Sequence, residues 1–322
     1  MLAIVAAAGR PHGRFGRVQG VLLLKPQIFY AAMSTEKQSK FQTIKKKVID
    51  PFVVGAKDLI RENREAWASR SKLQANPDVV LSRREMFVLR QAPRDLIKSL
   101  PLLIAFAIPV VGYVAPVLGY YYPKWLLPWQ FWTAEDKAEF LEEDVRKKAT
   151  FYPEVASLVA SIDSSNTFLQ DAAAAYAKDT DREKMDPKTL PEFRELFESP
   201  GALEKLSTKH LRLLLRATSA SPFVGFYAYL PKDTIVQRLE RRASEISVDD
   251  LLLLQPNGVK DLSVQELIFA CEERGLVVPY KDEDACRVAL EEWLSMYDTK
   301  QPRAQPSSLL LHAPILADFK RD

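Results

Sequence analysis

One uncharged stretch constrains this chain more than any other feature of its sequence. Residues 99–123 (SLPLLIAFAIPVVGYVAPVLGYYYP) contain no Asp, Glu, Lys, Arg or His. As a helix, this stretch extends for roughly 37 Å, enough to cross a hydrocarbon core about 30 Å thick. Lys98 and Lys124 flank it, and tyrosines and tryptophans gather at its C-terminal edge, as they do at membrane interfaces. The stretch therefore predicts a transmembrane helix over residues 99–123.

Prolines inside the stretch favour a membrane span over its alternative, a buried helix of a soluble core. An interior proline costs a helix in water about 3 kcal/mol. In a membrane, neighbouring helices and hydroxyl groups can pair the carbonyl groups that proline leaves free. Pro109 and Pro116 are seven residues apart on one helix face, so they predict a kink in one direction.

The N-terminus predicts a targeting segment. Residues 1–35 hold four basic side chains, and the first acidic residue is Glu36. This pattern predicts a mitochondrial presequence over 1–35; a secretory signal is the alternative, although no basic residue precedes the apolar residues 1–8. Removing 1–35 changes the formal net charge from +3 to about −1, so overall basicity gives no argument for nucleic-acid binding.

The rest of the chain shows helical periodicity interrupted by proline and glycine, and no hairpin signal. Residues 36–98 predict amphipathic pre-membrane helices, and 124–322 predict a helical domain. Capping boxes are expected where Ser82, Thr133 and Ser263 each precede an acidic residue by three positions. The fold class is therefore all-α. Helices are expected at about 36–74, 83–98, 135–150, 153–162, 166–178, 191–198, 206–218, 231–246, 247–254, 263–275 and 283–297, and residues 301–322 as a strap that packs back on the domain.

Three C-terminal strings carry a family resemblance: GVKDLSVQELIFACEERGL (258–276), EDACRVALEEWL (283–294) and PSSLLLH (306–312). Together with LSRREMFVLRQAPRDLIKSLP (81–101), they resemble the LETM-domain family of mitochondrial inner-membrane proteins over about residues 80–316. The match is closest to the short branch of LETM domain-containing proteins. The resemblance implies a proline-kinked membrane helix followed by a compact, 14-3-3-like helical domain that faces the matrix.

The resemblance also implies function. It implies binding of the mitochondrial ribosome, support of respiratory-complex biogenesis and a role in mitochondrial organisation. A further family role is ion homeostasis, by potassium or calcium exchange against protons. Calcium sensing is not carried over, because residues 282–284 lack the spaced ligands and the glycine of an EF-hand loop.

Catalytic, metal and cofactor motifs are not found in the sequence, so we predict no enzyme, metal or cofactor. Cys271 has the spacing of a core residue, and His210 is expected to be surface or core filler. An exchanger acting alone is disfavoured, because the stretch between Lys98 and Lys124 lacks the ionisable side chains that mark ion pathways. Gly112, Ala115 and Gly119 could form a packing face for a homo-oligomer.

Local charge provides the candidate binding site. Residues 203–242 carry eight basic and three acidic side chains, whereas residues 255–298 carry four basic and ten acidic ones. At helical spacing, the first four basic residues form one stripe on an otherwise apolar helix. The stripe predicts contact with ribosomal RNA phosphates; a solvated face and a cardiolipin site are the alternatives. The candidate anion-binding residues are Lys205, Lys209, Arg212, Arg216, Arg238, Arg241 and Arg242.

Two arguments about topology disagree. Five basic residues precede the apolar stretch between positions 83 and 98, against two acidic ones. The positive-inside rule would place that side in the matrix. The family resemblance instead implies a single-pass protein with its C-terminal domain in the matrix, and we follow the resemblance. The sequence thus predicts an inner-membrane, ribosome-binding protein, with a component of a cation/proton exchange system as the alternative.

Overall fold

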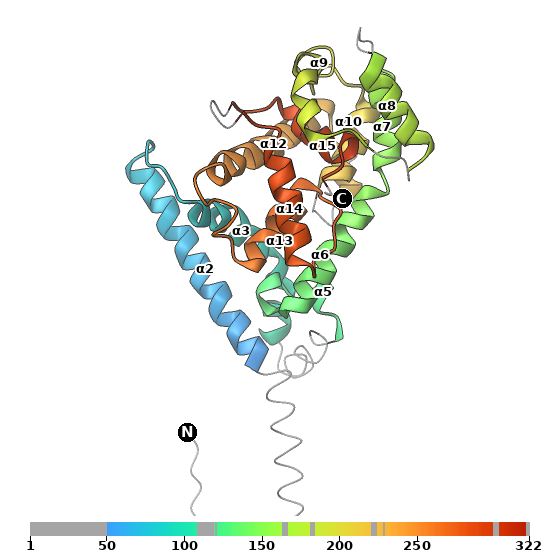
Figure 1. The fold of residues 1–322 in the computed structure, drawn as a ribbon. Coiled ribbons are helices and arrows are strands. Elements are labelled where there is room, and N and C mark those ends of the chain that lie inside the picture. Colours follow the sequence, from blue (N-terminus) through green and yellow to red (C-terminus); the bar gives the residue numbers. More distant parts are fainter. Residues whose placement is uncertain are drawn as a thin grey trace, which may run out of the picture. The chain divides into compact units, whose positions relative to one another are not determined.

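The computed structural model describes residues 50–107, 119, 121–162, 167–180, 184–219, 224–227, 229–298 and 303–319. Within these ranges every regular element is helical, and the only bridge pairing joins Met185 and Ala317. The predicted all-α class is confirmed (Figure 1). The elements are α2 (Asp50–Ala75), α3 (Arg83–Ala107), α5 (Pro123–Leu126), η2 (Trp129–Phe131), α6 (Ala134–Ala149), α7 (Tyr152–Ala160), α8 (Thr167–Lys178), η3 (Pro187–Phe193), α9 (Arg194–Glu198), α10 (Thr208–Thr218), α11 (Val224–Tyr227), α12 (Lys232–Leu253), α13 (Val264–Arg274), α14 (Glu283–Leu294) and α15 (Ser307–Leu316).

The helices that precede the apolar stretch belong to the same compact unit as the helices that follow it. That unit comprises Asp50–Asp322. α2 and α3 form an antiparallel hairpin (Figure 1), and α2 packs against η2. A Cβ atom added at Gly55 would lie 2.7 Å from the Phe131 ring, so this approach of α2 to η2 requires glycine. The pre-membrane helices are therefore structural neighbours of residues 124–322.

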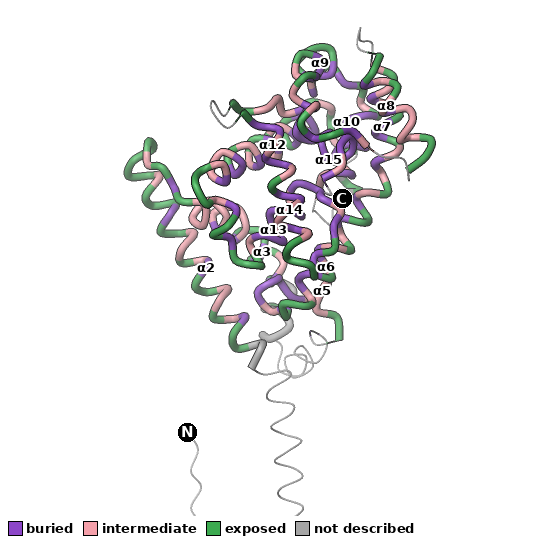
Figure 2. Tube along the Cα trace, in the orientation of Figure 1, coloured by how far each residue is buried: buried purple, intermediate pink, exposed green. Residues whose placement is uncertain are grey.

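The centre of the fold is α15, which the sequence suggested only as part of a strap. Every residue from Ser308 to Leu316 is buried (Figure 2). A helix that is apolar on all sides must be surrounded by others. α15 contacts α7, α9, α10, α12 and η3, and it contributes to both large apolar cores of the unit.

Helix ends follow the sequence signals closely. Thr133 and Ser263 form the predicted capping boxes with Asp136 and Glu266, and Gly275 ends α13 in the left-handed region with φ of 73°. One prediction was wrong: residues 232–253 form a single helix, α12, rather than two. Residues 232–253 contain neither proline nor glycine, so no residue interrupts the helix where the two expected helices meet.

The apolar stretch begins as a continuation of α3. This helix runs without a break past Lys98 to Ala107, so Pro101 lies within it. In the described ranges, none of the helices combines the length and the apolar composition needed to cross a membrane. The predicted kink residues Pro109 and Pro116 lie outside the described residues, as does the predicted presequence 1–35.

Two buried histidines join α10 to α15. The Nε2 atoms of His210 and His312 are 2.9 Å apart, and His312 Nδ1 lies 2.7 Å from the Ser308 carbonyl oxygen. Because a carbonyl oxygen can only accept, His312 donates from Nδ1, and its Nε2 accepts from His210. Burial lowers the pKa of His210 to about 3 and that of His312 to about 4. His210 is thus a core residue.

We expect this pair to make the fold sensitive to acid. Below pH 6.5 the unfolded chain binds protons at both histidines, whereas the folded chain stays neutral there until about pH 4. At pH 5 the cost is about 2 kcal/mol per histidine relative to pH 7.5. Urea unfolding of the full chain in detergent at both pH values measures it. The variant His210→Gln with His312→Gln should lose this part of the pH dependence; an unchanged dependence would contradict a neutral buried pair.

Candidate functional site

The predicted basic stripe lies on α10, which is otherwise buried. Ser207 caps this helix by accepting from the His210 amide, and the leucines at 211 and 213–215 pack into the core. Lys209 and Arg212 are exposed and Arg216 is half-buried. α10 therefore presents one polar edge, as the 100° periodicity indicated.

The four basic side chains of the stripe differ in whether they already form hydrogen bonds or ion pairs within the protein. Lys205 donates to the Ser199 hydroxyl at 2.6 Å, and Lys209 lies 3.5 Å from a carboxylate oxygen of Glu154. Arg212 and Arg216 form no ion pair with any side chain in the part of the chain that is described. These two guanidinium groups are the cations on α10 that remain available to an external anion.

The second basic group, on α12, does not form a single surface. Arg238 is exposed, and Arg241 is exposed and lies 3.2 Å from Glu245. Arg242 turns inward: its side chain is 12% exposed and donates to the Glu273 carbonyl at 2.8 Å. Arg242 therefore joins α12 to Glu273 of α13 and stabilises the fold.

The two basic groups are joined through an acidic pair. Lys232, at the start of α12, donates to the Glu204 carbonyl at 2.6 Å just before α10. Burial and a hydrogen bond with Glu204 raise the pKa of Glu240. The α10 stripe and the outer α12 cations thus flank two carboxyl groups, which limits the continuous basic area to α10.

The basic residues that precede the apolar stretch face acids of the domain. Arg83 binds Asp249 at 2.7 Å, and Arg94 lies 3.6 Å from Glu245 on the same helix, α12. Arg90 lies 3.3 Å from a carboxylate oxygen of α13. We call these contacts of Arg83, Arg90 and Arg94 the α3 seam.

Behind the seam lies a fully buried arginine. The Arg274 side chain is 0% exposed and contacts Asp249 at 2.8 Å and, in addition, Asp250. Asp250 also accepts from Trp293 Nε1 at 3.0 Å and from the Tyr297 hydroxyl at 2.6 Å. Burial alone would raise the pKa of Asp249, but the charges of Arg274 and Arg83 outweigh it and lower that pKa.

A third cluster lies where α3 meets η2, and we call it the aromatic rim. Buried Asp95 accepts from Trp129 Nε1 at 2.8 Å and from Gln130 Nε2 at 2.6 Å. The Lys98 ammonium lies 4.4 Å from the centre of the Trp132 ring. Burial raises the pKa of Asp95 to about 6, against the opposing effect of these hydrogen bonds.

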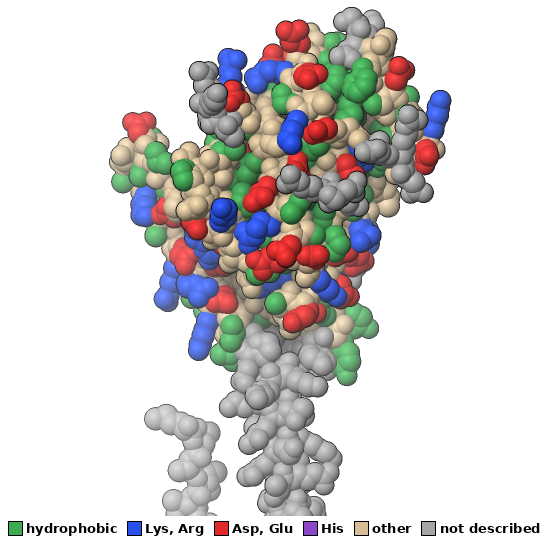
Figure 3. Space-filling view, in the orientation of Figure 1, with side chains coloured by type: hydrophobic (Ala, Val, Ile, Leu, Met, Phe, Trp, Pro, Cys, Tyr) green, Lys and Arg blue, Asp and Glu red, His purple; other side chains and the backbone are tan. Residues whose placement is uncertain are grey.

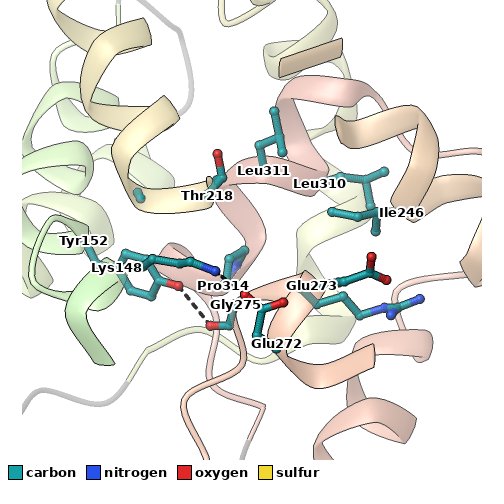
Figure 4. Close-up of a pocket in the computed structure, with 12 residues that line it drawn as sticks. Lys148, Tyr152, Thr218, Ile246, Glu272, Glu273, Gly275, Leu310, Leu311 and Pro314 are labelled. Carbon is teal, nitrogen blue, oxygen red and sulfur yellow. Dashed lines mark hydrogen bonds and ion pairs between the residues drawn. The ribbon is translucent and has the colours of Figure 1, made fainter. Parts of the chain in front are cut away.

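A small pocket beside α13 has polar walls whose groups are already paired (Figure 4). Buried Lys148 pairs with Glu272, and the Tyr152 hydroxyl donates to the Gly275 carbonyl at 2.9 Å. Among the described residues, no three of His, Cys, Asp and Glu are placed to hold a metal ion. The pocket therefore offers no free donor set for a ligand.

Sequence reasoning missed both the α3 seam and the aromatic rim. The basic residues of the α3 seam were counted only as an excess of positive charge before the apolar stretch. The one signal was the pair Asp249–Asp250 within the apolar run VDDLLLL, because two adjacent carboxylates in a buried helix require cationic partners.

These features define a class: an all-helical domain held by internal ion pairs, in which the two flanks of an apolar segment contact each other. Comparison with known sequences then gives the family. The sequence model described as "LETM1-like, RBD" matches residues 81–316, and the chain belongs to this family.

Similar proteins fall in two groups. A LETM1 domain-containing protein 1 from Xenopus tropicalis is 29% identical over 276 residues, covering 82% of this chain and 75% of that protein. Its human namesake is 28% identical over 281 residues, covering 85% and 73%. A Drosophila melanogaster protein named mitochondrial proton/calcium exchanger protein is 24% identical over 247 residues, covering 73% of this chain and only 23% of that protein.

We expect Arg274→Met to be strongly destabilising. It leaves Asp250 buried without its cation and Asp249 paired with Arg83 alone, and such a loss costs about 3–5 kcal/mol. Arg241→Met, which removes an exposed pair, should cost less than about 1 kcal/mol. Urea unfolding at pH 7.5 compares the two. Adding Asp249→Asn and Asp250→Asn should restore part of the loss; equal, small effects of both arginine substitutions would show that the buried network contributes little.

We expect Asp95→Asn to stabilise the fold near neutral pH. The unfolded carboxyl loses its proton near pH 3.8 and the folded one near pH 6, so the parent loses stability as the pH rises through this interval. The amide stays neutral and still accepts from Trp129, so the variant should gain about 1–3 kcal/mol at pH 7.5 and little at pH 4. Asp95→Leu is the control. It should be less stable than Asp95→Asn at both pH values, because leucine cannot accept the hydrogen bonds of Trp129 and Gln130. A loss of stability in Asp95→Asn at pH 7.5 would contradict the account.

Proposed function

We propose that this chain is a mitochondrial LETM-type protein that is held at the inner membrane by the apolar stretch 99–123. The mitochondrial assignment is supported by the name of the Drosophila relative and by the Arg-bearing, acid-free N-terminus. The membrane attachment is supported by the uncharged stretch and by the exposed side chains of Leu100, Ile104 and Tyr121 within it.

We propose further that the helical domain binds the mitochondrial ribosome through the α10 stripe, and in this way supports respiratory-complex biogenesis and mitochondrial organisation. The observation that carries this proposal is the state of Arg212 and Arg216. Arg83, Arg242 and Arg274 are committed to internal pairs, whereas these two project from a rigid helix. Arginine on a fixed backbone suits bidentate contact with phosphate, and the stripe has no aromatic side chains for stacking on bases. Duplex RNA or an acidic ribosomal protein surface fits this face best.

Two charge reversals test the ribosome proposal. Arg212→Glu with Arg216→Glu should abolish salt-sensitive co-sedimentation with mitochondrial ribosomes, because both phosphate contacts become repulsive. In the parent, log affinity should fall with log salt by about 0.7–0.9 per neutralised phosphate.

The matched control changes the same amount of charge on the acidic end of the domain. Lys260→Glu with Lys281→Glu replaces two exposed lysines and should leave co-sedimentation unchanged. Equal loss in both variants, or binding by the Arg212/Arg216 variant that equals the parent, would exclude α10 as the contact.

A second candidate function, cation/proton exchange, is favoured by one observation. Asp95 is buried, gains and loses its proton near pH 6, and lies four residues before the apolar stretch. A protonatable carboxyl beside an apolar stretch is a candidate group for an ion pathway. Purified chain in liposomes should show no electroneutral cation/proton flux under the ribosome proposal. Robust flux that is lost in Asp95→Asn would favour the exchanger instead.

A further inference from the structure

The two flanks of the apolar stretch contact each other directly. On the N-terminal flank, Asp95 and Lys98 belong to α3; on the C-terminal flank, Trp129 and Trp132 belong to η2 and its end. Asp95 accepts from Trp129 at 2.8 Å, and Lys98 lies 4.4 Å from the centre of the Trp132 ring. The point where the chain enters the stretch and the point where it leaves are therefore neighbours.

More distant contacts fix the same arrangement. The α3 seam joins the N-terminal flank to α12 and α13, which lie more than 100 residues further along the chain. On the other side of α3, Glu62 of α2 accepts from Gln130 of η2 at 2.8 Å. α3 thus packs on α12 and α13 through ion pairs, and α2 is joined to η2 by the buried Glu62–Gln130 contact.

Length then limits where the stretch can go. A segment that leaves and returns to one place reaches at most half its length, about 19 Å for 25 helical residues. Two full crossings of a 30 Å core would need about 40 residues. The stretch is long enough to enter one leaflet and too short to cross the membrane and return.

The end of the unit from which the stretch emerges is apolar. Large hydrophobic side chains are exposed there on α2, on α3 and next to α5, and Figure 3 shows hydrophobic surface at the base of the body. Tyr121 is 69% exposed, and Ile97 is 68% exposed. This surface is continuous in sequence with the uncharged stretch, which identifies lipid as its partner. Its members are Val54, Ile97, Leu100, Ile104, Tyr121 and Tyr122.

We propose that both ends of the apolar stretch lie on the same side of the membrane, so that α2, α3 and the helical domain share a single aqueous compartment. This inference rests on the proposed membrane attachment and replaces the single crossing that hydropathy suggests. A single crossing would place α3 and α6 on opposite sides of the bilayer and would break the α3 seam, exposing Asp249 and Arg274. The same-side arrangement also removes the disagreement between the positive-inside rule and the family resemblance. The basic residues of α3 and the C-terminal domain can then both lie in the matrix.

Single-cysteine labelling of the full chain in mitoplasts tests the sidedness. Asn76→Cys reports on the turn between α2 and α3, and Lys281→Cys reports on the domain; both positions are exposed. The native Cys271 and Cys286 are buried, so the parent chain gives the background. With a membrane-impermeant maleimide, both new cysteines should behave alike: both protected or both modified, and both modified after detergent. Modification of only one before detergent overturns the proposal.

A second measurement separates this inference from the proposed attachment and identifies the occupant. The purified full chain should float with phosphatidylcholine–cardiolipin vesicles. Leu100→Glu with Ile104→Glu should lower the floated fraction at least tenfold, whereas Val80→Glu, an exposed position in the loop before α3, should not. A parent chain that stays in solution, or that covers its exposed apolar surface only by self-association, overturns membrane attachment itself. A parent that floats and labels on opposite sides overturns the same-side insertion alone.

Discussion

The buried ion pairs between Arg274 and the adjacent carboxylates Asp249 and Asp250 are the interaction on which the rest of this structure depends. Asp250 has no other cationic partner among the described residues, and Asp249 is shared between that guanidinium and Arg83 from a helix 166 residues away in the sequence. The pairing therefore does more than offset the cost of burial. It determines that α3 packs on α12 and α13, and with α3 it fixes where the apolar stretch begins.

The same charge pairing decides which surfaces remain available for function. Arginines from α3, α12 and α13 are used internally, whereas Arg212 and Arg216 form a narrow basic edge on α10 without ion pairs among the described residues. At the other end, Asp95 accepts from Trp129 and Gln130, so the two flanks of the uncharged stretch are joined.

The sequence was most informative where the signal was local. The capping boxes at Thr133 and Ser263, the left-handed Gly275 and the buried leucines around the α10 stripe could all be predicted, because each depends on residues within one or two helical turns. The seam could not, because the partner of Arg83 is set by packing rather than by spacing. The inward turn of Arg242 and the central position of α15 depend on tertiary contacts in the same way. Hydropathy likewise gives the length of the apolar stretch, whereas the contacts of its flanks show that its two ends lie close together.

Hydrogen–deuterium exchange of the membrane-bound full chain tests most directly whether α3 is an integral part of the domain. If the seam holds in the membrane, the amides of residues 87–96 should exchange slowly and open in the same cooperative unit as those of α12 and α13. Fast exchange of residues 87–96 beside a protected α12 and α13 would show that α3 lies apart from the domain, and would contradict this account.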